Sequence, residues 1–138
     1  PGEEKIKVDI FFQWAPGWTN FESVYRAMQA KPHFDCQIIL APYFSRGAKA
    51  PDYTAQRDLL NDKGIRYTEY HEYEITARKP HVVFLQNPYD DARPNELQSL
   101  TLNRRNISIA YIPYGLDMGD GERNRVYQYN LPCQNVAR

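Results

Sequence analysis

Three apolar, strand-like runs in this chain each end in the pair Pro-Tyr, at residues 42–43, 88–89 and 113–114. Proline has no backbone N–H and cannot continue a central strand, so each pair predicts the point at which a strand leaves its sheet. If the three strands are parallel, their tyrosines gather at the carboxyl edge of the sheet. Ligands bind at that edge in open α/β sheets. The alternative interpretation of each pair is that it only stops a strand.

Strand-like runs and segments with helical spacing alternate along the chain. We expect five strands, at residues 6–12, 36–41, 65–70, 82–85 and 107–112. The alternation is typical of an α/β fold, a doubly wound, mostly parallel five-stranded sheet with helices on both faces. Right-handed crossovers favour the strand order 3-2-1-4-5, with the switch point between the first and fourth strands. Residues 1–138 fit a single Rossmann-like domain.

Local signals predict where the helices begin and end. Thr19 and the glutamate three residues later indicate a capping box at the start of the first helix. Asp52 is expected to cap the second helix, and Gly64 to follow its last turn in the left-handed conformation. A third helix is expected to begin at Pro94, and a last one to lie over residues 123–129.

The composition argues against several classes of function. Lys+Arg and Asp+Glu both number 17, so the formal net charge is zero, and a nucleic-acid partner, which requires a basic face, is not expected. The apolar runs are too short for a transmembrane segment. Cys36 and Cys133 lack metal-ligand spacing, as do the three histidines, so we expect no metal site and two reduced thiols in a cytoplasmic protein. Gly17 is the single glycine of the first loop, which argues against pyrophosphate binding there, and no cofactor is expected.

Polar and aromatic residues collect where the predicted strands end. Trp14 and Trp18 either stack on a sugar or a base, or pack beneath the first loop. The loop after the most buried strand contains the polar group Gln86, Asn87, Tyr89 and Asp90, which either contacts a ligand or closes the loop through an Asx turn. The candidate ligand-binding residues are Trp18, Tyr43, Gln86, Asn87, Tyr89, Asp90 and Tyr114.

Residues 79–90, KPHVVFLQNPYD, resemble the segment KPDIVFxQxPYD of CDP-glycerol glycerophosphotransferase-like proteins of teichoic acid and capsule synthesis. The segment YIPYG at residues 111–115 and the segment YNLP at residues 129–132 also resemble stretches of that family, in the same order. His81 stands where the family has an aspartate. The resemblance covers most of the chain.

This resemblance implies that the chain is the amino-terminal, acceptor-side half of a two-domain GT-B enzyme. The other half would bind CDP-glycerol or a related nucleotide donor and hold the catalytic histidines, so no catalytic residue is assigned here. The implied acceptor is a polysaccharide or a lipid-linked molecule. The implied enzyme is cytoplasmic, either free or associated peripherally with the inner face of the plasma membrane. Two alternatives stay open: a non-catalytic, flavodoxin-like module that binds a ligand or protein, and the amino-terminal half of a nucleotide-sugar GT-B glycosyltransferase.

The 138-residue chain by itself is predicted to be inactive, because its sequence contains no nucleotide-phosphate loop and no paired base and nucleophile. A transfer and hydrolysis assay with radiolabelled CDP-glycerol should read background. Clear turnover would contradict the assignment of the chain to one half of an enzyme.

Overall fold

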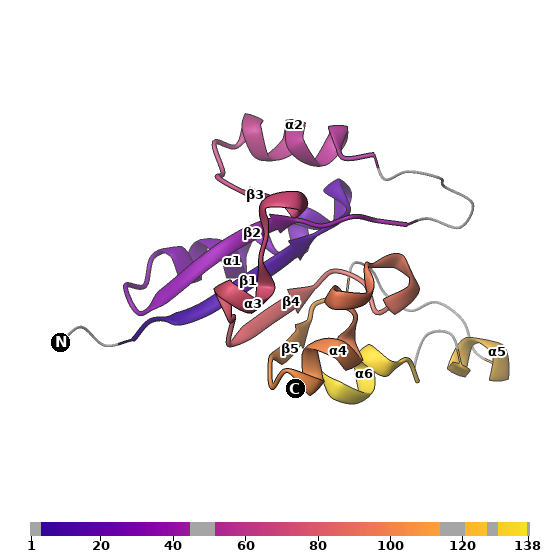
Figure 1. Cartoon of the computed structure of the whole chain (residues 1–138). Helices are drawn as coiled ribbons and strands as arrows, with labels where there is room; N and C mark the ends of the chain where they lie inside the picture. The colour runs from indigo at the N-terminus through magenta and orange to yellow at the C-terminus, as the bar shows by residue number, and fades with distance from the viewer. Residues whose placement is uncertain (1–3, 45–51, 114–120, 127–129, 138) are drawn as a thin grey trace.

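A computed structural model describes residues 4–44, 52–113, 121–126 and 130–137 (Figure 1). Its centre is a five-stranded sheet with the strand order β3-β2-β1-β4-β5, in which every neighbouring pair is parallel. The strands are β1 (Ile6–Phe12), β2 (Phe34–Leu40), β3 (Thr68–Glu69), β4 (Val82–Leu85) and β5 (Ser108–Tyr111). The predicted fold class, strand order and switch point are therefore confirmed.

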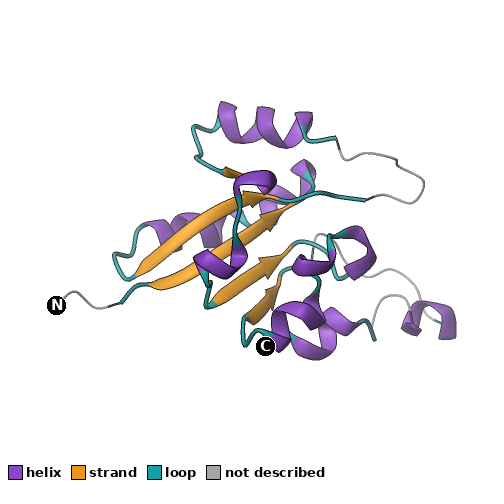
Figure 2. Ribbon diagram, in the orientation of Figure 1, coloured by secondary structure: helices purple, strands orange, loops and turns teal. Residues whose placement is uncertain are grey.

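Helices cover both faces of the sheet, as predicted (Figure 2). On one face α1 (Glu22–Gln29) and α2 (Thr54–Asp62) pack over the side chains of Val8, Ile10 and Phe12. On the other face the helices that pack over Phe11, Val83 and Leu85 are α3 (Ile75–Arg78), α4 (Ser99–Arg104) and α6 (Pro132–Val136). The alternation of β1 side chains between the two clusters follows from the pleat of a strand.

The third strand is shorter than expected, because only two of the six residues predicted there pair with the sheet. Thr68 and Glu69 are the paired residues, opposite Ile39 and Leu40 of β2. The polar segment then turns at once into the 3₁₀ helix η2 (Tyr70–Glu72). A sheet edge with few apolar side chains has little burial to favour a longer strand.

The predicted capping box at Thr19 is wrong. A 3₁₀ helix, η1 (Ala15–Asn20), begins immediately before Pro16, and Thr19 lies inside it. The Thr19 hydroxyl donates to the carbonyl oxygen of Pro16 (3.4 Å), while Phe21 is the N-cap of α1. Proline favours the first turn of a helix, so helical structure starts earlier than the capping pattern indicates.

The second helix begins and ends near the predicted residues. Asp52 Oδ1 accepts a hydrogen bond from the Thr54 backbone N–H (3.0 Å), although Tyr53 occupies the N-cap position. Gly64 has φ +63° and donates its N–H to the carbonyl oxygen of Asn61 (3.0 Å), as expected for the left-handed residue after a helix.

The helix expected from Pro94 is divided into η4 (Asn95–Leu97) and α4 by the extended backbone of Gln98. The Ser99 N–H at the start of α4 donates to Asp90 Oδ1 (2.9 Å). This bond holds the start of α4 against the loop after β4. Near the end of the chain, α5 (Glu122–Asn124) forms one turn of the last expected helix, and residues 127–129 of that prediction lie outside the described residues. Helix α6 begins at Pro132, the last residue of the segment YNLP.

Asp9, on the central strand, forms an ion pair with the partly buried Arg78 that the sequence pattern does not indicate. Its fully buried carboxylate accepts hydrogen bonds from Tyr73 Oη (2.7 Å) and Arg78 Nε (3.0 Å). Arg78, at the end of α3, also pairs with Asp35 of β2. Burial raises the pKa of Asp9, and the bonds from Tyr73 and Arg78 oppose that rise. The network attaches the four-residue α3 to the sheet.

Replacing Arg78 with Met should lower the free energy of unfolding by about 3–5 kcal/mol, because Asp9 is left buried without its counter-charge. Arg78 lowers the pKa of Asp9, so its loss raises that pKa further. An acid with a raised pKa in the folded state binds its proton more tightly when folded. The loss of unfolding free energy caused by Arg78→Met should therefore be smaller at about pH 4 than at about pH 7.

Urea unfolding at the two pH values measures this effect, with the exposed Arg104→Met as the control. An equal loss of stability at both pH values would contradict the assignment of an unpaired Asp9 charge.

Candidate functional site

The carboxyl ends of β1, β2 and β4 are joined by one buried side chain, Gln13. Its Nε2 donates to the carbonyl oxygens of Pro42 (2.6 Å) and Ala92 (3.2 Å). Its Oε1 accepts a hydrogen bond from Asn87 Nδ2 (2.9 Å). The loops after three strands are thus fixed relative to one another at the predicted switch point.

Gln86 closes the first loop from the other side of the switch point. Its Oε1 accepts hydrogen bonds from the backbone N–H groups of Gln13 (2.7 Å) and Trp14 (2.9 Å), and its Nε2 donates to the Trp14 carbonyl oxygen (3.2 Å). Gly17 allows this approach, since a Cβ there would lie 3.1 Å from Gln86 Nε2. Dinucleotide-binding Rossmann domains hold pyrophosphate on the turn after the first strand. In this chain the backbone N–H groups at the start of that turn, those of Gln13 and Trp14, donate instead to the neutral Gln86 Oε1.

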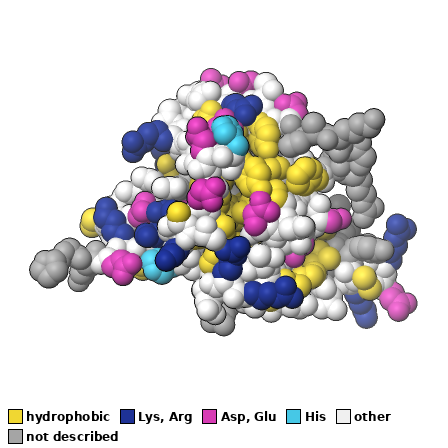
Figure 3. Space-filling model, viewed as in Figure 1, with side chains coloured by type: hydrophobic (Ala, Val, Ile, Leu, Met, Phe, Trp, Pro, Cys, Tyr) yellow, Lys and Arg dark blue, Asp and Glu magenta, His cyan; other side chains and the backbone are white. Residues whose placement is uncertain are grey.

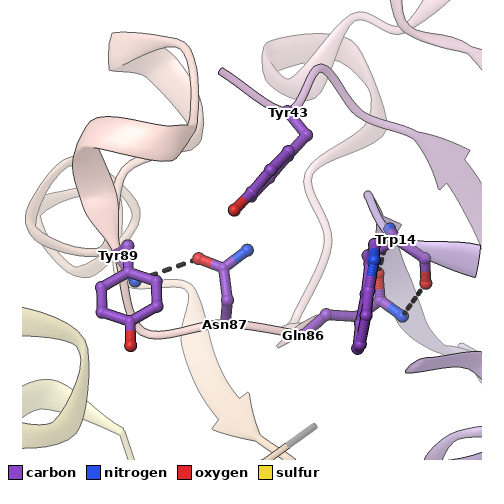
Figure 4. Close-up of a pocket in the computed structure, with 5 residues that line it drawn as sticks. All are labelled: Trp14, Tyr43, Gln86, Asn87 and Tyr89. Carbon is purple, nitrogen blue, oxygen red and sulfur yellow. Dashed lines mark hydrogen bonds between the residues drawn. The ribbon is translucent and has the colours of Figure 1, made fainter. Parts of the chain in front are cut away.

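A pocket of about 240 Å³ opens beside this closure and is lined by Trp14, Tyr43, Gln86, Asn87 and Tyr89 (Figure 4). Among the described residues that line it, three have aromatic rings and two have carboxamides. Trp14 is 42 % exposed and Tyr43 is 36 % exposed, so both side chains are partly at the protein surface. Two of the three Pro-Tyr pairs therefore supply a tyrosine to one pocket, as expected from parallel strands.

Asn87 is held in one orientation at the base of this pocket. Its Oδ1 accepts hydrogen bonds from the Tyr89 backbone N–H (3.0 Å) and from Arg93 Nη1 (3.2 Å). The bond to Tyr89 is the predicted Asx turn. Asn87 therefore closes the loop, and it also lines the pocket.

Asp90 closes the loop and is not among the residues that line the pocket. Its carboxylate accepts hydrogen bonds from Arg93 Nη2 (2.6 Å), the Ser99 N–H (2.9 Å) and Ser99 Oγ (2.5 Å). The Arg93 side chain is fully buried and also donates to the carbonyl oxygens of Asn87 (2.9 Å) and Leu97 (3.2 Å). These contacts favour the interpretation of Asp90 as a loop-closing residue.

Trp18 does not reach the pocket, which corrects its place among the candidate residues. Its side chain is 1 % exposed and packs edge-on against Phe12 (5.5 Å between ring centroids) and Tyr25 (5.6 Å). The η1 helix turns Trp18 into the core and leaves Trp14 at the pocket. Tyr114 lies outside the described residues.

Gln13 and Arg93 shape the pocket and are absent from the predicted set. Gln13 directly follows an apolar strand, the same signal that identified Gln86, so it was open to prediction. Arg93 has only its spacing of three residues from Asp90 to suggest a role, and such spacing is common on protein surfaces.

The described residues give no support for thiolate chemistry or for a metal centre. Burial raises the pKa of the Cys36 and Cys133 thiols to about 11, so both are protonated at neutral pH. Across the described ranges, no group of three or more His, Cys, Asp or Glu side chains is placed to hold a metal ion. Within the same residues, no helix is long and apolar enough to cross a membrane. Charges of both signs are interspersed on the face seen in Figure 3.

Comparison with known proteins supports the fold and assigns no family. No family model matches the sequence, and no curated protein matches it. The structure is similar to the crystal structure of a UDP-N-acetylglucosamine 2-epimerase, with a TM-score of 0.58 and 12 % sequence identity. The similarity covers 97 % of this chain and 40 % of the epimerase chain. The chain therefore has the Rossmann-like fold of one half of a GT-B-like enzyme and spans less than half of that structure's length.

Replacing Asp90 with Ala should lower the free energy of unfolding by about 3 kcal/mol, because the buried Arg93 guanidinium loses its counter-charge. The neighbouring Asp91 is exposed and is the matched control, for which Asp91→Ala should change stability by less than about 0.5 kcal/mol. Thermal and urea unfolding measure both variants. Similar stability of the two variants would contradict the loop-closing role of Asp90.

Proposed function

We propose that this chain is the acceptor-binding half of a GT-B-like transferase that moves glycerol phosphate, or a related phospho-polyol, from a CDP-linked donor. The acceptor is a polysaccharide or a lipid-linked molecule of cell-surface polymer synthesis. Two features support the proposal: the pocket at the carboxyl edge of the sheet, and the resemblance of residues 79–90 and 111–115 to glycerophosphotransferase segments. A lipid-linked acceptor would bring the complete enzyme to the inner face of the plasma membrane.

The observation that carries this assignment is the position of Gln86. Its Oε1 accepts hydrogen bonds from the Gln13 and Trp14 N–H groups, next to the position of phosphate in nucleotide-binding Rossmann domains. Because these two N–H groups are already bonded to Gln86, they are not offered to the phosphates of a nucleotide donor. The chain is therefore better suited to the acceptor than to the donor. The resemblance to glycerophosphotransferases implies that a second half binds the donor and supplies the catalytic base.

In this mechanism an acceptor hydroxyl attacks the β-phosphate of the donor in line with the leaving nucleotide. Phosphoryl transfer of this kind depends mainly on positioning and on charge stabilisation. The contribution of this chain is positioning. Trp14 and Tyr43 would hold the acceptor at the open edge of the sheet, and the Gln13–Asn87 hydrogen bond would keep the pocket floor in place.

A nucleotide-sugar glycosyltransferase half is the second candidate. The fold likeness to a nucleotide-sugar epimerase favours it, although a fold supports many chemistries. The two candidates share the acceptor role of this chain and differ in the donor. A UDP-sugar that replaces CDP-glycerol as the donor would favour the second candidate.

In the protein that carries this chain together with a donor-binding half, Trp14→Ala should raise the KM for the acceptor by about tenfold or more, with the KM for CDP-glycerol unchanged. Trp14 lines the pocket and is 42 % exposed, so its loss should affect the acceptor more than folding. Steady-state transfer kinetics with each substrate varied in turn measure the effect.

Phe44→Ala is the matched control, since Phe44 is 40 % exposed and adjacent to Tyr43 but does not line the pocket. A rise in the donor KM alone would contradict the acceptor role.

A further inference from the structure

We infer that the pocket at the carboxyl edge takes an uncharged sugar ring, and that a phosphate-bearing unit of the acceptor stays outside it. The inference rests on the proposed acceptor role and narrows the class of acceptor. It distinguishes a glycan end from the end of a poly(glycerol phosphate) chain, which carries charge beside every polyol.

The first argument is charge. The described residues that line the pocket are Trp14, Tyr43, Gln86, Asn87 and Tyr89, none of which has an acidic or a basic side chain. The cation just behind them is Arg93, whose side chain is fully buried. Its Nε, Nη1 and Nη2 atoms are each engaged, by Leu97, Asn87 and Asp90 respectively. A phosphate placed in the pocket would lose hydration and find no free cation among the lining side chains.

The second argument is the number of aromatic rings that line the pocket. Trp14, Tyr43 and Tyr89 come from three different loops, and the hydrogen bonds of Gln13 and Gln86 hold those loops together. Aromatic rings present a large apolar surface with few rotatable bonds. The C–H face of a sugar ring is apolar and packs on such a surface, whereas a linear polyol has no comparable face.

The third argument is the remaining hydrogen-bond donor on the pocket floor. Asn87 Nδ2 carries two hydrogens, and one of them is bonded to Gln13 Oε1. The second has no acceptor within the described part of the chain. Figure 4 shows the Tyr43 hydroxyl directed toward this carboxamide. A fixed amide N–H and a phenol hydroxyl suit the hydroxyl or acetamido oxygens of a sugar, and the amide is already oriented before the ligand arrives.

Size limits what enters the pocket. Its volume of about 240 Å³ is below the range of roughly 300–1,000 Å³ for drug-sized ligands, so it accommodates one ring-sized unit of a larger molecule. The rest of a glycan would extend past the partly exposed side chains of Trp14 and Tyr43.

Titration of the 138-residue chain, followed by ¹H–¹⁵N NMR, tests the inference with four probes. These are the methyl glycosides of glucose and of N-acetylglucosamine, sn-glycerol 3-phosphate, and cytidine monophosphate. At least one glycoside should shift the Trp14 indole and the Asn87 side-chain amide with a Kd of about 1–10 mM, and glycerol 3-phosphate should shift neither. Trp14→Ala should weaken glycoside binding tenfold or more. Trp14→Tyr, which keeps an aromatic ring, and Phe44→Ala should retain binding.

The spectra of each variant also report whether the rest of the chain is folded. Shifts caused by glycerol 3-phosphate at these residues, without an effect of either glycoside, would overturn the sugar-ring inference and leave the acceptor role in place. Pocket shifts caused by cytidine monophosphate alone would overturn both. Absence of any glycoside shift at about 50 mM would overturn the sugar-ring inference, while the transfer kinetics of Trp14→Ala judge the acceptor role independently.

Discussion

Gln13 is the residue on which the arrangement of the carboxyl edge depends. Its backbone N–H donates to Gln86 (2.7 Å), and its backbone carbonyl accepts from Gln56 Nε2 (2.6 Å). Its side chain bonds Asn87 and the main chain of the loops after β2 and β4. All of these groups lie in the interior, where an unmatched polar group is costly. Gln13, with every side-chain donor and acceptor hydrogen-bonded, thus connects the loops after β1, β2 and β4 to each other and to α2. These bonds hold the residues around the pocket in fixed positions relative to one another.

Two arginines, one partly and one fully buried, act in a similar way where regular structure is short. Arg78 connects the four-residue α3 to Asp9 on the central strand, and Arg93 connects the irregular segment after β4 to Asp90. A long amphipathic helix is held in place by apolar contacts along its whole length. Segments of one turn have too little apolar surface for that, and a multidentate guanidinium fixes them through several directed bonds.

The sheet was predictable from the sequence because its signals are local. Apolar runs, the spacing of helical residues and the Pro-Tyr endings each indicate one element, and chirality then leaves few ways to connect them. Gln86, Asn87 and Tyr43 were identified for the same reason, since polar or aromatic groups directly follow predicted strands. The choice between Trp14 and Trp18 depended on how a six-residue 3₁₀ helix rotates its side chains against the core, which no local pattern specifies.

The ion pairs could not be predicted from local sequence patterns. Asp9 meets Arg78 across 69 positions of the chain, and a single polar residue within an apolar strand gives no indication of its partner. The same holds for the length of β3, which depends on how much apolar surface β2 and the neighbouring helices leave for an edge strand to cover. These features follow from packing between distant segments, which becomes visible only when the sheet is assembled.

The neutral composition of the pocket also determines how the site responds to its ionic surroundings. Dissolved salt screens charges over a Debye length of about 8 Å at physiological ionic strength, and it acts mainly on charges that face water. The described residues that line the pocket have carboxamides and aromatic rings, and the ion pair behind them has an arginine with no exposed side-chain surface. The shape of the pocket and its affinity for an uncharged ligand should therefore be nearly constant from dilute buffer to concentrated salt, unlike those of Rossmann sites that bind anions.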